Sequence, residues 1–180
     1  MRVGIHSHQL IKAPDDRLGE AALSITLKRE DRYRRRVSLT TDCGEQFLLD
    51  LPVPTYMAHG DGLLLSNGRV VLVRAAEEPL LELRAATSEA LAKLAWHIGN
   101  RHTPAEITDA ALYIQPDHVL ADMVRGLGGR VTEVMRAFEP EGGAYGGNGA
   151  LEKSHHHGEH SHGHAHEGTA GHHSPSVAVK

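Results

Sequence analysis

The stretch LLLSNGRVVLV, residues 63–73, constrains the fold more than any other segment, because two apolar runs flank the pair Asn67-Gly68. Both residues of that pair tolerate the positive φ of a tight hairpin, so the stretch predicts two antiparallel strands joined by a short turn. Other short apolar segments, separated by turn signals such as Asp42-Cys43-Gly44, come before it. We therefore predict that residues 1–75 form a small all-β domain, either an antiparallel barrel or a sandwich.

The spacing of apolar residues changes in the second half of the chain, where strand-like segments alternate with two helical ones. The first helix is expected to start at an N-cap, Thr87 or Ser88, and to stop at Gly99-Asn100. Two short strands, a second helix capped by Asp117 and a final strand follow. The order β-α-β-β-α-β over residues 76–140 is that of a ferredoxin-like domain, so the predicted fold class is α+β. Such a sheet leaves one face open for association.

The composition changes again at Glu141. The segment EGGAYGGNGA, residues 141–150, is rich in glycine, and a histidine-rich segment follows it. Neither segment buries enough apolar surface to offset the entropy lost on ordering. We therefore expect residues 141–180 to form a flexible Gly/His-rich tail in the absence of a ligand.

Charge and cysteine content exclude several classes of protein. The net charge is −4 with histidine neutral, which argues against a broadly basic nucleic-acid binder. The single cysteine, Cys43, precludes an intrachain disulfide and does not indicate an oxidising compartment. Neither a signal peptide nor a membrane span is expected. The basic run from Arg29 to Arg36 is interrupted by acidic residues and is interpreted as a solvated strand edge. A cytoplasmic protein without a nucleic-acid or membrane partner is the expectation.

Sequence templates for catalysis are missing from the chain. It contains no H-E-x-x-H, no Walker A loop, no G-x-S-x-G and no Cys/His zinc pattern. The glycine-rich GLGGR, residues 126–130, follows a predicted helix and is typical of a helix C-terminus. We therefore expect a binding protein rather than an enzyme, with no catalytic residues.

Closely spaced histidines make the C-terminal segment a candidate for metal binding. Neutral imidazole suits Ni²⁺, Zn²⁺ and Cu²⁺, and many imidazoles on a flexible chain offer capacity with little geometric selection. A purification tag is the alternative, but a tag is an unbroken run, whereas Ser, Gly, Glu and Ala interrupt this one. The candidate ligands are His155, His156, His157, His160, His162, His164 and His166.

Among the internal histidines, His102 lies in a constrained loop between a predicted helix stop and Pro104. No other His or Cys occurs two to four residues after it, so an ordinary surface residue is the simplest interpretation. A two-fold axis that paired two copies of the chain would supply a second ligand. His118 is interpreted first as a polar residue in the first turn of its helix. His6 and His8 are expected to hold a metal only weakly.

A combination of motifs points to a known family. GNRH at residues 99–102 is followed by DHVLADM at 117–123, by FEPEGGAY at 138–145 and then by the histidine-rich end. In this order the motifs strongly resemble the UreE family, the urease accessory nickel chaperones. The β-rich first half also fits the family, so the resemblance covers essentially the whole chain. GNRH alone is modest evidence, and the combination is strong evidence.

The resemblance implies an N-terminal β domain that binds partners or peptides, and a ferredoxin-like metal-binding domain that dimerises head to head. In the family, the GNRH histidine, here His102, shares a nickel ion with its counterpart on the second subunit. Some members also bind metal through a His-x-His pair before the second helix. Here the triplet is Pro116-Asp117-His118, which lacks the first histidine. Tail histidines complete the shared site in some members, and any of His155 to His157 is a candidate for that role here.

The function implied by the resemblance is that of a cytoplasmic, homodimeric nickel metallochaperone. It would deliver Ni²⁺ for nickel insertion during urease maturation, with Zn²⁺ or Cu²⁺ as competing ions. The implied partners are the urease accessory GTPase UreG and apo-urease within the urease maturation complex. A nickel or zinc storage or buffering protein without a dedicated client is the alternative.

Overall fold

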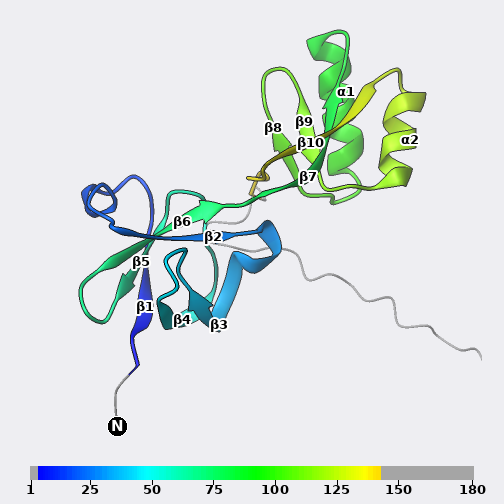
Figure 1. Ribbon diagram of the computed structural model, residues 1–180. Helices are drawn as coiled ribbons and strands as arrows, with labels where there is room; N and C mark the ends of the chain where they lie inside the picture. Colours follow the sequence, from blue (N-terminus) through cyan, green and yellow to red (C-terminus); the bar gives the residue numbers. More distant parts are fainter. Residues whose placement is uncertain (1–3, 143–180) are drawn as a thin grey trace, which may run out of the picture.

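A computed structural model describes residues 4–142, which form the two lobes seen in Figure 1. The first lobe is an all-β domain with two short 3-10 turns, and it comprises β1 (His6–Ile11), η1 (Asp16–Leu18), β2 (Leu23–Leu27), η2 (Arg29–Asp31), β3 (Tyr33–Thr40), β4 (Gln46–Tyr56), β5 (Gly62–Leu65) and β6 (Val70–Ala75). The second is an α+β domain, and it comprises β7 (Glu77–Arg84), α1 (Ser88–Gly99), β8 (Ala105–Ile107), β9 (Leu112–Ile114), α2 (His118–Gly126) and β10 (Arg130–Ala137). Most of the expected tail, from residue 143 on, lies outside the described residues.

The six strands of the first domain form one sheet in the order β2-β6-β5-β1-β4-β3. Two of its pairings are parallel, β1 with β4 and β2 with β6, so the prediction of a purely antiparallel domain is wrong. Alternation of apolar residues along a strand indicates which face is buried but carries no information about strand direction. A parallel pair needs a long connection, and here intervening strands supply it in both cases.

The first sheet curls until its two edge strands, β2 and β3, approach each other at Asp42. The Asp42 carboxylate accepts hydrogen bonds from the Ser24 hydroxyl at 2.7 Å and from the Thr26 amide at 2.9 Å. The Asp42 amide donates to the Ser24 carbonyl at 2.8 Å. Two backbone groups of the β2 edge, the Ser24 carbonyl and the Thr26 amide, are therefore paired there. The curled sheet encloses the core residues Ile25, Phe47, Leu49, Leu51, Met57, Leu63, Leu65, Val71 and Val73.

The predicted hairpin at Asn67-Gly68 joins β5 to β6, which pair antiparallel as expected. Gly68 has a φ of 82°, while Asn67 does not adopt a positive φ. The Gly68 amide donates to the Leu65 carbonyl at 2.9 Å, and the Leu65 amide donates to the Arg69 carbonyl at 2.8 Å. The turn therefore uses one left-handed residue rather than the two of the tightest hairpins.

The second domain has the predicted element order β-α-β-β-α-β, and its sheet has the strand order β10-β7-β9-β8. Both helices cover one face of this sheet (Figure 1). The Thr87 hydroxyl caps α1 by accepting from the Ala90 amide at 3.1 Å, and the Asp117 carboxylate caps α2 by accepting from the Val119 amide at 2.8 Å. Across residues 4–142, no helix has the length and apolar character needed to cross a membrane.

The opposite face of the second sheet is covered at one end and exposed at the other, where Arg84 and Thr132 lie, so the expectation of an open face is wrong only for the covered end. Phe138 is fully buried there with Leu80, Ala111 and Tyr113. Having left β10 at one edge of the sheet, the chain crosses this face to reach β8 at the other edge. There the Glu139 amide donates to the Glu106 carboxylate at 2.9 Å, and the Glu141 amide donates to the Ala105 carbonyl at 2.8 Å.

A buried arginine joins the two domains. Arg32 has 0% of its surface exposed, and its guanidinium donates to the Glu139 carboxylate and to the Phe138 carbonyl. The same guanidinium lies 5.2 Å from the ring centre of Tyr56. The Glu139 carboxylate also accepts from the His59 amide at 3.0 Å. Burial at this joint raises the pKa of Tyr56 to about 12.

The joint changes the interpretation of the basic run from Arg29 to Arg36. Its second half lies on β3, which is an edge strand as predicted. Arg32, however, is buried in the joint and is not solvated. The Arg29 amide also bonds across the joint, to the buried Glu78 carboxylate at 3.0 Å. Sequence spacing cannot reveal such a role, because Glu139 lies 107 residues away from Arg32.

Candidate metal centre

His102 lies in the loop between α1 and β8, in a backbone conformation that its residue type disfavours. The helix ends at Gly99, and the amides of Arg101 and His102 donate to the carbonyls of Ile98 and Gly99 at 3.0 and 2.9 Å. His102 has a φ of 54° and is the one non-glycine residue between positions 4 and 142 with a positive φ. Left-handed backbone at a non-glycine residue costs about 1–2 kcal/mol, and such strain concentrates at functional sites. The side chain of His102 is exposed.

Strand register brings His118 to the same end of the second domain as His102. Ala105 at the start of β8 pairs with Ile114 at the end of β9. The loop that precedes β8 and the loop that follows β9 therefore emerge from the same end of the sheet. His118 is the first residue of α2, just beyond the second loop, and its side chain is exposed.

The chain also leaves the second domain at this end, towards the candidate tail. The bond from the Glu141 amide to the Ala105 carbonyl places Glu141 beside a residue three positions after His102. The His102 loop, the start of α2 and the root of the C-terminal segment are thus neighbours. The seven candidate histidines from His155 to His166 lie outside the described residues.

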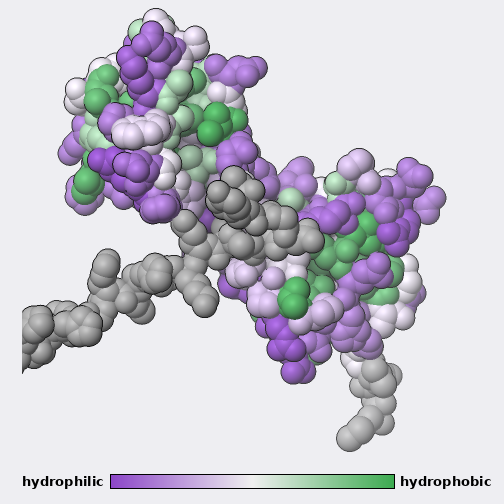
Figure 2. Space-filling view, turned by 180° about the vertical axis from the view of Figure 1, so that it is seen from behind, coloured by the Kyte–Doolittle hydropathy of each residue, from purple (hydrophilic) through white to green (hydrophobic). Residues whose placement is uncertain are grey.

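Large apolar side chains are exposed on the elements that adjoin His102. Trp96, near the end of α1, is 65% exposed, and Ile107, at the end of β8, is 51% exposed. Val119, next to His118, is 62% exposed. Figure 2 shows apolar side chains at the surface of this domain, the upper left lobe, among hydrophilic ones. Exposed apolar side chains of this size are typical of association surfaces when they gather in one region.

The described residues do not assemble a complete metal site from a single chain. Across positions 4–142, no group of three or more His, Cys, Asp or Glu side chains is placed to hold a metal ion. His102 and His118 lie at the same end of the domain, but they are not part of a group of three or more candidate ligands. Further ligands for an ion at His102 must therefore come from outside the described part of one chain.

Comparison with known proteins identifies the family of the chain. A model of the UreE urease accessory protein N-terminal domain matches residues 6–76, and one of the UreE urease accessory protein C-terminal domain matches residues 78–168. Together the two matches span most of the chain.

This chain belongs to the UreE urease accessory protein family.

Individual UreE proteins are similar over much of their length. The urease accessory protein UreE of Chelativorans sp. (strain BNC1) is 51% identical over 146 residues, which are 80% of this chain and 88% of the relative. That of Ruegeria pomeroyi is 46% identical over 147 residues, 82% of this chain and 89% of the relative. That of Rhodopseudomonas palustris (strain HaA2) is 52% identical over 125 residues, 69% of this chain and 58% of the relative. All three are named as accessory proteins.

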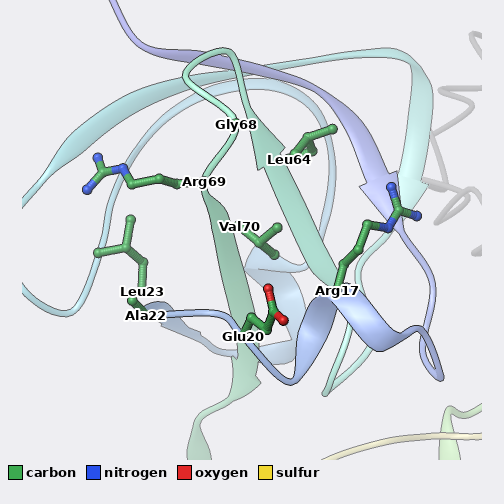
Figure 3. A pocket seen from close by; sticks show the side chains of 8 residues that line it. All are labelled: Arg17, Glu20, Ala22, Leu23, Leu64, Gly68, Arg69 and Val70. Carbon is green, nitrogen blue, oxygen red and sulfur yellow. The ribbon is translucent and has the colours of Figure 1, made fainter.

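The UreE N-terminal domain carries a shallow pocket of about 310 Å³. Figure 3 shows Arg17 and Arg69 on opposite sides of an apolar floor that includes Leu64 and Val70. Arg17 forms an ion pair with Asp15 at 2.7 Å, and the hydrogen bond between them lowers the pKa of Asp15 to about 2.

Arg69 is likewise paired, with Glu45. Both positive charges at the pocket are therefore compensated within the domain.

Two features of the candidate site in this UreE-family chain are not predicted from the sequence. The positive φ of His102 has no signal in the sequence, because no glycine marks the position. The exposure of Trp96 is also unexpected, since a tryptophan on an amphipathic helix usually indicates the buried face. A helical-wheel projection could have indicated the exposure of Trp96, because this residue lies outside the stripe formed by the buried Leu94 and Ile98.

Proposed function

We propose that this chain is a homodimeric nickel metallochaperone that delivers Ni²⁺ for maturation of the urease active site. The observation that carries the proposal is the placement of His102. It is an exposed imidazole, held in a strained loop within the GNRH motif, at the end of the domain where the C-terminal segment departs. Family membership supports the assignment to urease maturation.

The dimer follows from the ligand count around His102. One imidazole does not form a selective site, and no three-ligand group occurs within residues 4–142. A two-fold axis beside His102 would bring two imidazoles to one ion. Trp96 and Ile107, exposed on the elements that the His102 loop connects, would supply apolar surface to bury in that contact.

Nickel delivery requires ligands that release the ion as well as bind it. Imidazole is a borderline ligand for Ni²⁺, and thiolates hold the ion more tightly. The only cysteine in the chain, Cys43, lies on the first domain, far in sequence from His102. The tail histidines, His155 to His166, would collect Ni²⁺ and raise its concentration beside the shared site. His118 is a further candidate ligand, and Zn²⁺ and Cu²⁺ are competing ions.

The proposal assigns a role to each part of the chain. Residues 1–75 would bind a partner or peptide, residues 76–140 would form a ferredoxin-like domain for metal binding and dimerisation, and residues 141–180 would be the supply tail. The receiving partner would be the urease accessory GTPase UreG or the complex with apo-urease. The site of action would be the cytoplasm.

Competition titration of the full chain against a chromogenic Ni²⁺ chelator tests the proposal. The wild type is expected to hold about one tightly bound Ni²⁺ per two chains and further, weaker ions. In His102→Ala the tight site should disappear while the weaker capacity remains. In a chain truncated after Ala150, the tight site should remain and the weaker capacity should disappear. Identical curves for His102→Ala and the wild type would overturn the assignment of His102.

His102→Gly is the matched control for backbone strain. It should lose the tight site as His102→Ala does, but it should be about 1 kcal/mol more stable than His102→Ala, because glycine adopts positive φ without cost. If His102→Gly kept the tight site, the imidazole would not be the ligand.

Storage or buffering of nickel is the second candidate function, and the cluster of histidines from His155 to His166 favours it. A storage protein needs the tail and does not need His102. Activation of apo-urease with purified accessory proteins separates the two functions. The metallochaperone predicts that His102→Ala reduces activation at limiting Ni²⁺ even though the tail is intact. Unchanged activation by that variant would favour storage.

A further inference from the structure

Two histidines of the first domain, His6 and His8, lie together on β1, remote in sequence from the GNRH motif. They are two positions apart on a strand, so their side chains project from the same face of the sheet. Between them, Ser7 is fully buried on the opposite face. The centres of the two imidazole rings are 4.4 Å apart, with the ring planes inclined by 52°.

Strand pairing positions His6, and a bulge positions His8. β1 is an interior strand: it pairs in parallel with β4 at His6 and Ser7, and antiparallel with β5 from Ser7 on, with a register shift between Ser7 and Gln9 that leaves His8 without a paired residue. The Ser66 amide donates to the His6 carbonyl at 2.8 Å, and the His6 amide lies 3.3 Å from the Ser66 hydroxyl. His8, within the bulge, is positioned by the paired residues on either side of it and by the contact of its ring with the Asp50 carbonyl. A ligand that bridges the two imidazoles therefore has little ordering cost to overcome.

Hydrogen bonds to backbone carbonyls define which ring nitrogens remain available. Nδ1 of His8 lies 2.8 Å from the Asp50 carbonyl oxygen, and Nδ1 of His6 lies 3.2 Å from the Gly4 carbonyl oxygen. A carbonyl oxygen only accepts, so each Nδ1 must carry the hydrogen, and in the neutral ring each Nε2 then has a lone pair. Metal-bound histidines commonly have this arrangement, in which a carbonyl orients the ring through its other nitrogen.

The separation of the two rings suits a shared ion. At a metal–nitrogen distance of about 2.1 Å, an ion lies about 3.2 Å from the centre of each imidazole ring, so two rings bound at a right angle have centres about 4.5 Å apart. The observed 4.4 Å is close to that value. Right-angled pairs of nitrogen ligands are typical of Cu²⁺ and Ni²⁺ in square-planar or tetragonal sites.

We infer that His6 and His8 form a two-imidazole site for a divalent first-row metal ion, separate from the site proposed at His102. No third protein ligand is gathered beside them within residues 4–142, so water or another small ligand fills the remaining positions. The ion is therefore exchangeable. Cu²⁺ binds to this site more tightly than Ni²⁺. Ni²⁺ binds more tightly than Zn²⁺ only if the ion keeps a tetragonal geometry.

Acylation of histidines by diethyl pyrocarbonate, located by peptide mass spectrometry, tests the site in the full chain. The free Ni²⁺ concentration is set with a chelating buffer, so that the tail does not deplete it. We expect rising Ni²⁺ to slow the acylation of His6 and His8 with a common midpoint. His59, an exposed histidine of the same domain, serves as the internal reference and should react at an unchanged rate.

Variants separate a shared ion from two independent effects. In His8→Ala, the midpoint for protection of His6 should rise by at least about tenfold, because the second imidazole no longer chelates. His8→Gln should raise the midpoint for protection of His6 by a similar factor, although the glutamine amide retains a donor for the Asp50 carbonyl. His59→Ala is the matched control and should leave the midpoint unchanged, as should His102→Ala.

Two results would overturn the inference. One is protection of His6 at an unchanged midpoint in both His8 variants, since the rings would then not share an ion. The other is unaltered acylation of both rings in the wild type at a free Ni²⁺ concentration that saturates the tail. Because the readout is specific to each residue, neither result depends on the behaviour of His102.

Discussion

The edge strands of the two sheets find their hydrogen-bond partners in different ways. The six-stranded sheet curls until its edge strands, β2 and β3, are bonded to each other through Asp42. The four-stranded sheet does not close on itself, and residues 139–141 cross its face and bond to its edge strand β8. The first domain therefore pairs part of its edges within its own sheet, whereas the second uses the segment that follows it.

The candidate metal ligands differ in the same way. His6 and His8 lie side by side on an interior strand, and one chain supplies both. His102 lies in a strained loop next to exposed apolar side chains, and by our proposal its second ligand comes from another copy. A sheet whose edges meet can thus present a preformed pair of ligands, whereas a sheet that does not close on itself is suited to sites that assembly completes.

A charge in the proposed dimer contact of the second domain should have the strongest effect on metal binding. Trp96→Asp places a charge within the proposed dimer contact and leaves His102 intact. We expect dissociation of the dimer and a loss of Ni²⁺ affinity at the tight site of roughly a thousandfold, because two imidazoles would no longer share one ion. Sedimentation velocity and chelator competition on the same samples measure both quantities.

The contrast with the first domain provides the control for Trp96→Asp. Protection of His6 and His8 by Ni²⁺ should be unchanged, because that pair lies within one chain. A monomeric Trp96→Asp variant that keeps the tight site would show that one chain completes it.

A smaller effect concerns the joint between the domains. Glu139→Gln removes the carboxylate that pairs with the buried Arg32 guanidinium. An uncompensated buried charge costs about 3 kcal/mol, so the free energy of unfolding in urea should fall by about that amount. The control is Glu89→Gln, which breaks an exposed pair with Lys93 at 2.7 Å and should cost less than about 0.5 kcal/mol. Equal losses for the two variants would mean that the joint contributes little to stability.

The smallest effect tests how the first sheet closes. Hydrogen bonding from the Ser24 hydroxyl lowers the pKa of Asp42 below its ordinary value of 3.8 in the folded protein. The stability that the carboxylate contributes is therefore present above that value and is lost as the pH falls through the folded pKa. Asp42→Asn should lower the free energy of unfolding at pH 7 by about 1 kcal/mol.

Acid then removes the difference between Asp42→Asn and the wild type, since protonation makes both side chains neutral. Urea unfolding at pH 7, 5, 4 and 3 should show a constant difference down to about pH 5 and a decreasing one below about pH 4. Asp109→Asn, at an exposed position in the β8–β9 turn, should show no such dependence. A difference that persists undiminished to pH 3 would argue that the charge of Asp42 does not hold the edges together.

Local features of the fold were predictable because they depend on neighbouring residues. The Thr87 and Asp117 caps bond to amides two or three positions ahead, and Asn67-Gly68 turns the chain within five residues. Pairing direction in the first sheet was not predictable, because β1 and β4 meet across two intervening strands. The burial of Arg32 depends on Glu139, which is 107 residues away in the sequence and follows the last strand of the second domain.

The candidate site was predictable in its residues but not in its geometry. The GNRH motif identified His102, while its left-handed backbone and its proximity to the chain leaving the domain emerge only from packing and strand register. The ring contact of His6 and His8 follows from their spacing once residues 6–11 are known to form an interior strand. From the sequence alone, only weak metal binding by His6 and His8 is expected, because nothing in the sequence indicates that the two rings meet.

The path of residues 138–141 has a mechanical consequence. A pull on the chain beyond Gly142 first loads the bond from the Glu141 amide to the start of β8, and next the bonds of Glu139 to Glu106 and to Arg32. Only after these yield does the force reach β10. The strand that begins three residues after His102 and the junction with the first domain would therefore bear any force on the C-terminal segment together.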